Sequence, residues 1–181
     1  MLVKEYKPSE DKNYSSTTDE KGIICSVTEE FAKISGYTQE EMIGQNHNIL
    51  RDPSMPKIIF SIMWKTIENK KTFVGFIKNR TRDGKFYWMA HKVHLFSKGK
   101  NGACKHLSYK TPMSTRAKHH MTKLYENLLE EERKGGIEAS QKYLKEYLDY
   151  RGVSFNEYME TFVDAGGLLK VGFFMARKLL S

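Results

Sequence analysis

The chain has 181 residues, of which 39% are hydrophobic and 12% aromatic, and its formal net charge at pH 7 is +8. This composition is typical of a globular protein and excludes an intrinsically disordered one. No stretch approaches the roughly 20 apolar residues of a membrane span, and the N-terminus has no apolar signal-peptide core. The sequence predicts a cytoplasmic protein, made of one domain of about 100 residues and an appended segment.

The positive charge is concentrated between Lys65 and Lys123, where fifteen Lys and Arg residues stand against two acidic residues, Glu68 and Asp83. Such a block could attract nucleic acid, an anionic membrane or an acidic protein. The alternative is a solvated strand face, because these basic residues alternate with apolar ones. No helix-turn-helix or RNA-binding motif accompanies the charge, so nucleic acid is not expected as a partner.

A helix is predicted after Ser54, which can accept a hydrogen bond from a free backbone donor, with Pro56 in its first turn. Asn69 is expected to end it. The helix has one apolar stripe, consisting of Met55, Ile59, Ile62, Met63, Thr66 and Ile67.

A hairpin is predicted around Asp83-Gly84, because this pair lies between two runs of strand-forming residues and a tight turn needs positive φ. Both faces of its second strand are apolar at the start: one face carries Tyr87, Met89, Val93 and Leu95, the other Phe86, Trp88 and Ala90. A strand with one wet face would alternate cleanly, so we expect something to cover the second face. The candidates are the segment around Leu2, Val3 and Tyr6, the helix after Met113, or a second subunit.

The chain after Pro112 is predicted to be helical. Ser114 or Thr115 can cap a first helix that Gly135-Gly136 ends, and a second helix ends at Gly152. Ser154 and Glu157 have the spacing of a capping box for a third helix. The final apolar run, Leu168 to Leu180, has thirteen residues and is too short to cross a bilayer. It is expected to pack on the other helices, to dock on a partner receptor, or to lie in a membrane interface.

Three separated motifs resemble the PAS domain of aerotaxis receptors. They are Ser35-Gly36-Tyr37-Thr38; His47-Asn48 followed by Arg51, Pro53, Met55 and Pro56; and Lys78-Asn79-Arg80 followed by Gly84, Tyr87 and Trp88. The motifs agree with the family in order and spacing, and the resemblance covers roughly Tyr14 to Met113.

The resemblance implies an α+β protein with a PAS fold, a five-stranded antiparallel sheet with short helices on one face, followed by an all-helical C-terminal extension. It divides the chain into an N-terminal cap segment (1–13), a PAS sensor domain (14–113) and a helical signalling or docking extension (114–181). In this family FAD lies between sheet and helices, and the domain reports the redox state of electron transport.

The residues expected to bind FAD, by the same resemblance, are Asn46, His47, Asn48, Arg51, Trp64, Phe73, Asn79 and Trp88. The chain departs from the family pattern at four positions. Asp52 and Ser54 replace an imidazole and a carboxylate implicated in flavin retention, Phe73 replaces an indole, and Thr28 replaces an Asn. A cofactor-free interaction adaptor is therefore the alternative, and a haem sensor is a further one.

Neither catalysis nor metal binding is expected. The six histidines form no metal-ligand motif, and there is no nucleophile elbow or phosphate-binding glycine loop. Cys25 and Cys104 lie far apart without a C-x-x-C grouping, which favours buried, inert thiols. A haem ligand is not expected on the helix from Met55 to Glu68, because that helix has no histidine.

Small PAS proteins similar to the CetB half of bipartite energy-taxis receptors carry a short helical tail of this kind. The resemblance therefore implies signalling to a separate transmembrane chemoreceptor-like transducer, with membrane association only through that partner. It also implies a homodimer formed through the PAS sheet face or the C-terminal helices.

Overall fold

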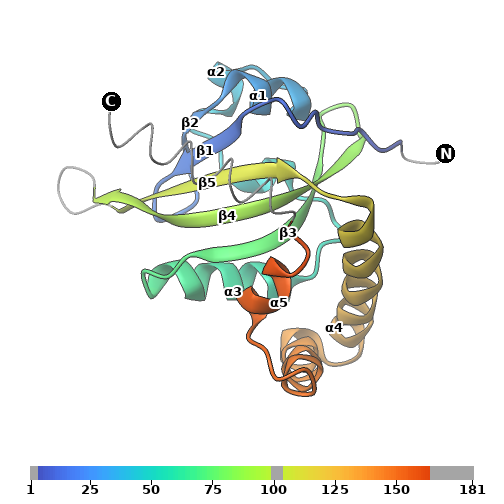
Figure 1. The fold of residues 1–181 in the computed structure, drawn as a ribbon. Coiled ribbons are helices and arrows are strands. Elements are labelled where there is room, and N and C mark those ends of the chain that lie inside the picture. The colour runs from blue at the N-terminus through green and yellow to red at the C-terminus, as the bar shows by residue number, and fades with distance from the viewer. Residues whose placement is uncertain (1–3, 99–103, 164–181) are drawn as a thin grey trace.

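The computed structural model describes residues 4–98 and 104–163. Its centre is a five-stranded antiparallel sheet with the order β2-β1-β5-β4-β3 (Figure 1). The strands are β1 (Tyr14–Thr18), β2 (Ile24–Val27), β3 (Phe73–Arg80), β4 (Phe86–Lys98) and β5 (Cys104–Pro112). The predicted α+β architecture is confirmed.

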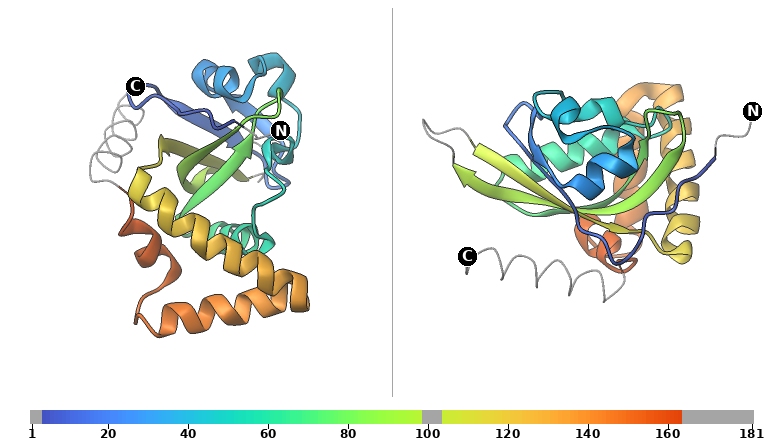
Figure 2. Two further views of the ribbon diagram at one scale, coloured as in Figure 1. Left: turned by 90° about the vertical axis from the view of Figure 1, so that its right-hand side faces the viewer. Right: turned by 90° about the horizontal axis from the view of Figure 1, so that it is seen from above.

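Short helices cover one face of the sheet, as Figure 2 shows from two further directions. They are α1 (Glu29–Ser35), α2 (Gln39–Met42), the 3₁₀ helix η1 (His47–Leu50) and α3 (Lys57–Glu68). Two further helices follow the sheet in sequence, α4 (Thr115–Asp149) and α5 (Phe155–Glu160). α4 packs against α3 and α5 packs against β3, so the C-terminal extension belongs to the same hydrophobic core as the sheet.

The predicted hairpin joins β3 and β4, with Phe73 opposite Val93 and Arg80 opposite Phe86. Its loop has five residues, closed by a hydrogen bond of 2.8 Å from Thr81 N to Lys85 O. Gly84 has φ +83°, the left-handed conformation that glycine adopts without steric cost. The hairpin prediction is confirmed, although the turn is longer than the tightest two-residue form.

The start of α3 differs from the prediction, whereas its end at Asn69 is confirmed. Ser54 does not cap the helix, because its N–H and hydroxyl both donate to Asp52 Oδ1 in a local turn. Pro56 occupies the cap position and has no side-chain acceptor to offer. Glu132 of α4 supplies the acceptor instead, at 3.0 Å from Ile58 N. The N-terminus of α3 is therefore capped by the C-terminal extension.

Two of the three predicted covers lie over the outer face of the sheet. The Trp88 indole packs against Tyr125 of α4, with ring centroids 5.7 Å apart. Tyr6 N donates to Phe86 O at 2.7 Å, which attaches the N-terminal segment beside the hairpin. Leu2 and Val3 lie outside the described residues.

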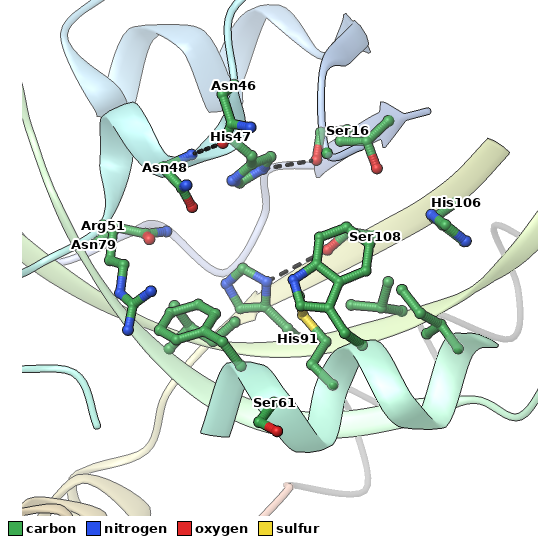
Figure 3. A pocket seen from close by; sticks show the side chains of 18 residues that line it. Ser16, Asn46, His47, Asn48, Arg51, Ser61, Asn79, His91, His106 and Ser108 are labelled. Atoms are coloured by element: carbon green, nitrogen blue, oxygen red, sulfur yellow. Dashed lines mark hydrogen bonds between the residues drawn. The ribbon is translucent and has the colours of Figure 1, made fainter. Parts of the chain in front are cut away.

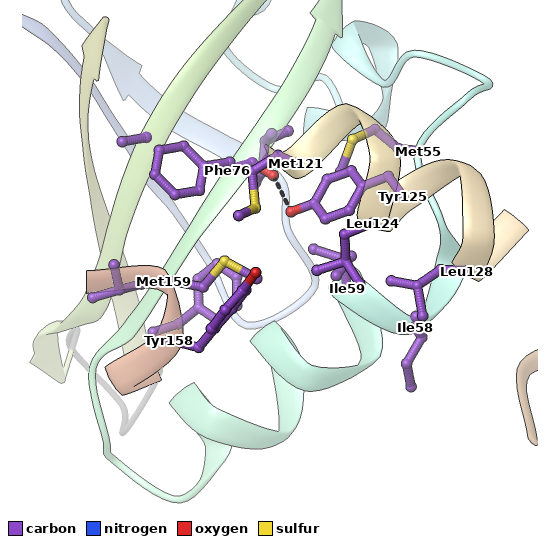
Figure 4. Close-up of a cluster of buried hydrophobic side chains, with 14 of the residues drawn as sticks. Met55, Ile58, Ile59, Phe76, Met121, Leu124, Tyr125, Leu128, Tyr158 and Met159 are labelled. Atoms are coloured by element: carbon purple, nitrogen blue, oxygen red, sulfur yellow. Dashed lines mark hydrogen bonds between the residues drawn. The ribbon is translucent and has the colours of Figure 1, made fainter. Parts of the chain in front are cut away.

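The extension also satisfies the free edge of the sheet at β3. Asn156 of α5 accepts from Val74 N at 3.2 Å and donates to Thr72 O at 2.6 Å. The Tyr125 hydroxyl donates to Phe76 O at 2.7 Å (Figure 4). An uncovered edge strand exposes unpaired backbone groups that invite pairing with other chains, and α4 and α5 remove that exposure here.

The helix boundaries of the extension agree with the sequence. Ser114 caps α4 and accepts from Ala117 N at 3.2 Å. Gly136, with φ +72°, breaks α4 into two arms that Figure 2 shows at an angle. Ser154 and Glu157 form the predicted capping box of α5. The apolar run from Leu168 to Leu180 lies outside the described residues.

Among the described residues, four of the fifteen basic residues of the block pair with acidic residues from other segments. Lys78 and Arg80 lie 3.5 and 3.6 Å from the buried Asp52 carboxylate. Arg82 pairs with Glu41 at 2.6 Å, and Lys118 pairs with Glu5 at 2.7 Å. Lys110 differs from these residues, because it is buried among neutral groups.

We expect Glu132→Ala to lower the free energy of unfolding by about 1–2 kcal/mol, because Ile58 N at the start of α3 would lose its acceptor. Chemical denaturation of both proteins would measure this difference. Glu126→Ala, an exposed position on the same helix, serves as the control and should change stability by less than about 0.5 kcal/mol. Equal effects of the two substitutions would contradict the capping role.

Candidate functional site

A cavity of about 260 Å³ lies between α3 and the sheet (Figure 3). Its apolar wall comes mainly from α3, with contributions from β3 and β4. Its polar wall comes from the strands, η1 and the residues flanking η1. The lining residues are Ser16, Thr18, Gly22, Asn46, His47, Asn48, Arg51, Phe60, Ser61, Met63, Trp64, Ile67, Ile77, Asn79, His91, Val93, His106 and Ser108.

The structure brings together most of the residues expected at the cofactor site. Asn46, His47, Asn48, Arg51, Trp64 and Asn79 all line this one cavity. They come from separate parts of the chain, and Figure 3 shows Asn48, Arg51 and Asn79 at one end of the cavity, with His106 at the other.

Phe73 and Trp88 do not line the cavity. Trp88 lies one residue away from Tyr87 and Met89, so strand alternation turns it to the outer face, against Tyr125. Phe73 is fully buried at the start of β3 and stacks on Phe155 of α5, with centroids 5.8 Å apart. Both side chains belong to the core shared with the extension.

Sequence reasoning missed several polar residues of the wall, notably Ser16, His91, His106 and Ser108. Alternation along the strands gives a signal for two of them. His91 lies two residues from Val93, so it shares the face that the sequence analysis gave to Tyr87, Met89 and Val93. Ser108 is on this face as well, because it is opposite Val93 in the sheet. Ser16 and His106 could be found only from the β1–β5 pairing.

Local hydrogen bonds hold the η1 residues against the cavity. Asn46 Oδ1 accepts from Asn48 N at 2.9 Å and so caps the helix turn that presents His47. His47 N donates to Gly22 O at 2.9 Å, which attaches η1 to the loop before β2. Gly22 has φ +77°, and a Cβ there would lie 3.3 Å from the Trp64 ring. A larger residue would therefore press on the cavity wall.

Three buried polar side chains of the wall have atoms without a hydrogen-bond partner among the described residues: Asn79 Nδ2, His91 Nε2 and His106 Nδ1. Their exposed fractions are only 3, 3 and 7%. A buried polar atom without a partner costs roughly 1–3 kcal/mol, and such atoms are rare in folded proteins. Their convergence on one cavity indicates a ligand with complementary polar atoms.

The electrostatic character of the cavity is set by guanidinium, amide and imidazole groups, because no Asp or Glu is among its lining residues. Burial, helped by the nearby Lys110, lowers the pKa of His47 to about 3. Burial and Lys110 also lower the pKa of His91 well below its ordinary value. Both rings are therefore neutral at physiological pH, and Arg51 is the charged residue of the wall.

We expect the ligand-free protein to lose stability as the pH falls from about 6.5 towards 3. The unfolded chain binds protons at His47 and His91 in this range, whereas the folded chain does not. Urea unfolding at a series of pH values would measure the loss. His47→Gln should reduce the slope, while His119→Gln, an exposed position on α4, should leave it unchanged. Identical slopes in all three proteins would contradict the assignment.

The departures at Asp52 and Ser54 lie outside the cavity wall. Burial opposes the ionisation of Asp52, but hydrogen bonds from Ser54 and the charges of Lys78 and Arg80 lower its pKa overall. Asp52 is therefore a carboxylate that connects the turn before α3 to β3, and its effect on the cavity is indirect.

Residues 4–98 and 104–163 contain neither a metal-ligand cluster nor a membrane-spanning helix. No group of three His, Cys, Asp or Glu side chains is arranged to hold a metal ion there. No helix in these ranges has the length and apolar character needed to span a membrane.

Comparison with known proteins agrees with the fold. Residues 24–108 match a family model described as PAS fold. The chain is 39% identical over 93 residues to the aerotaxis receptor of Escherichia coli (strain K12), which is 51% of this chain and 18% of the receptor. It is 29% identical over 72 residues to a nitrogen fixation regulatory protein of Klebsiella pneumoniae, which is 40% of this chain and 14% of that protein. The chain thus spans less than a fifth of the length of these relatives.

Solved structures of other proteins have the same fold as this chain. A light-oxygen-voltage domain, whose mechanism was studied with a flavin analogue, superposes with a TM-score of 0.54 at 18% identity, over 64% of this chain and 88% of its own. A PAS domain from a Colwellia psychrerythraea protein gives a TM-score of 0.50 at 24% identity, over 56% of this chain and 86% of its own. Together with the sheet order, these likenesses show that the chain has a PAS fold, that residues 24–108 match the PAS fold family model, and that about half of the chain is similar in sequence to part of the aerotaxis receptor.

Proposed function

We propose that this PAS domain is a sensor whose cavity binds the ring system of a flavin, with FAD as the cofactor. The observation that carries the proposal is the set of three buried, unpartnered polar side chains, Asn79, His91 and His106, in the wall of one cavity. FAD is chosen among planar heterocycles because the family that the three sequence motifs resemble binds it.

The residues of the cavity fit the chemistry of a flavin ring. One edge of that ring carries carbonyl oxygens and ring nitrogens, which can accept from Asn79 Nδ2 and from an imidazole N–H of His91. Its methylated edge is apolar, and the cavity offers Trp64, Ile67 and Val93 as apolar wall. When bound, a flavin takes up electrons reversibly, which changes the charge and hydrogen bonding of its ring.

The cavity can enclose only the ring of so large a cofactor. Its volume of about 260 Å³ lies just below the ~300–1,000 Å³ of usual small-molecule sites. Asn48 is exposed, so the cavity reaches the surface there. The half-buried Arg51, with its guanidinium 4.0 Å from the Phe60 ring, is the cation available at this end for the phosphates.

The cavity is connected to the C-terminal extension through α3. Phe60, Met63, Trp64 and Ile67 of α3 line the cavity, while Glu132 of α4 caps the start of the same helix. A shift of α3 on a change in the ligand would therefore strain the contacts with α4. This path supports a signal that leaves the domain through its helical extension.

We also propose that the signal passes to a separate transducer of the chemoreceptor type. A surface groove of about 820 Å³ runs between α4 and the hairpin, lined among others by Lys78, Lys118, Lys123 and Leu129. Glu5 and Glu126 lie in the same lining, so the groove offers a partner segment apolar contacts and charges of both signs. A homodimer formed through the sheet face or the C-terminal helices remains a prediction.

A cofactor-free adaptor is the second candidate, and the small volume of the cavity favours it. The two functions are distinguished by titrating FAD, FMN and riboflavin into ligand-free protein and following flavin fluorescence. We expect saturable quenching at a ratio of one to one. Val93→Phe, which places a ring inside the cavity, should abolish binding and keep the melting temperature. Failure of all three flavins to bind would overturn the flavin proposal.

A further inference from the structure

Lys110 is a buried amine in the C-terminal half of β5, with only 3% of its surface exposed. Its Nζ donates to Ser16 Oγ at 2.7 Å and to Ser108 O at 3.3 Å, and lies 4.2 Å from the centre of the Phe31 ring. Among the described residues, no carboxylate pairs with it. A buried charge without an opposite charge is costly, so this position requires a reason.

The amine is connected to the cavity through Ser16. Since Lys110 donates to the Ser16 oxygen, the Ser16 hydroxyl hydrogen is free to donate to His47 Nε2, 3.2 Å away. Both Ser16 and His47 line the cavity, and Figure 3 shows their contact. The route from the cavity to Lys110 Nζ is thus two hydrogen bonds long.

A second connection runs through the sheet. Lys110 lies directly opposite His91 in the pairing of β4 with β5. The His91 ring bonds through Nδ1 to Ser108 Oγ at 3.3 Å, and its Nε2 has no partner among the described residues. Lys110 therefore lies next to His91 and Ser108, two polar strand residues of the cavity wall.

The titratable groups around Lys110 are His47 from η1, His91 from β4 and Tyr14, its neighbour in β1. None of them supplies a negative charge at neutral pH. Burial lowers the pKa of Lys110 well below its ordinary value, and Lys110 in turn lowers the pKa values of both histidines. An amine in this setting gains a proton readily once a negative charge is placed nearby.

We propose that Lys110 is the proton-accepting counter-charge of the cavity, and that it stabilises the ligand in its negatively charged form. This proposal rests on the proposed function for the identity of the ligand. For a flavin, the proposal predicts that Lys110 stabilises the reduced ring. A ring that has received two electrons but only one proton carries a negative charge.

The proton balance is explicit. An external reductant such as dithionite supplies two electrons to the ring, and one proton from solvent goes to the ring. Lys110 Nζ takes the second proton from solvent, and for this step the hydrogen bonds reverse: the Nε2–H tautomer of His47 donates to Ser16 Oγ, and the Ser16 hydroxyl donates to the lone pair of neutral Lys110 Nζ. The electrons remain on the ring, and no covalent bond forms between ring and protein. Reoxidation returns both protons to solvent.

The first test is the reduction potential of the flavin-loaded full chain, compared with that of Lys110→Met. In Lys110→Met, the equilibrium between oxidised and reduced flavin should shift at least tenfold towards the oxidised form. For a two-electron couple, this lowers the reduction potential by at least ~30 mV. Lys92→Met is the matched control, because Lys92 lies on the opposite face of β4, and its potential should not change. Equal potentials for wild type and Lys110→Met would overturn the proposal. Lys110→Gln serves if the Met variant does not fold.

The second test uses ligand-free protein and separates this proposal from the proposed function. Lys110→Met should be more stable than wild type at neutral pH, and the difference should shrink as the pH rises towards ~10.4, because unfolded lysine then also loses its proton. A difference independent of pH would overturn the proposal. If no flavin binds but the pH-dependent difference is present, the flavin assignment fails while Lys110 retains its proton-accepting role.

Discussion

Replacing Tyr125 with alanine is expected to lower the free energy of unfolding by about 3–5 kcal/mol, as large aromatic truncations in cores do. Tyr125 lies on α4, is 2% exposed, and packs on Trp88 of the sheet. Its hydroxyl donates to Phe76 O at the free edge of β3. The substitution would therefore leave a cavity and an unpaired carbonyl between the sheet and the extension. Urea unfolding measures the loss.

Two companion variants make this prediction specific. Tyr150→Ala, at the end of the same helix, removes a side chain that is 89% exposed and should change stability by less than about 0.5 kcal/mol. Tyr125→Phe isolates the hydroxyl and should cost about 1–3 kcal/mol. If Tyr125→Ala were as mild as Tyr150→Ala, the extension would not be part of the core.

Replacing His91 with leucine is expected to act in opposite directions on the free and the loaded protein. The ligand-free protein should gain less than the ~1–3 kcal/mol that an unpartnered buried nitrogen costs, because an apolar group of similar size replaces the ring but the bond from His91 Nδ1 to Ser108 Oγ is also lost. Affinity for the flavin should fall about tenfold, the effect of one lost hydrogen bond at ~1.4 kcal/mol. Thermal unfolding and fluorescence titration measure the two effects.

His94→Leu is the matched control for this prediction. His94 lies on the same strand, and its Nδ1 is also buried without a partner among the described residues. It stacks on Tyr109 on the opposite face of the sheet, away from the cavity. This variant should stabilise the free protein and leave the affinity unchanged. If His94→Leu lowered the affinity as much as His91→Leu does, a direct role of His91 in flavin binding would be contradicted.

The elements that depend on local patterns could be predicted from the sequence. Gly84 marked the hairpin, Asn69 the end of α3, and Ser154 with Glu157 the start of α5, because each acts through neighbouring backbone groups. The family resemblance then located six residues of the cavity wall, four of which stand in the motifs themselves.

The features that were missed depend on contacts distant in sequence. Glu132 caps α3 from 74 residues away, so Ser54 was the natural but wrong candidate. Trp88 was different, because its alternation with Tyr87 and Met89 already placed it on the outer face, and only the family pattern suggested a place at the cofactor. Lys110 looked like one of many basic strand residues, and only the pairing of β5 with β1 and β4 shows that it is buried beside the cavity.

The most direct test of the central claim, that the cavity holds a flavin, is the visible absorption spectrum of freshly purified protein, followed by denaturation and chromatography of what is released. We predict the bands of oxidised flavin and recovery of FAD, both absent from Val93→Phe. A Soret band would show haem instead. A colourless protein that cannot be reconstituted with any flavin would contradict the claim and leave the adaptor as its function.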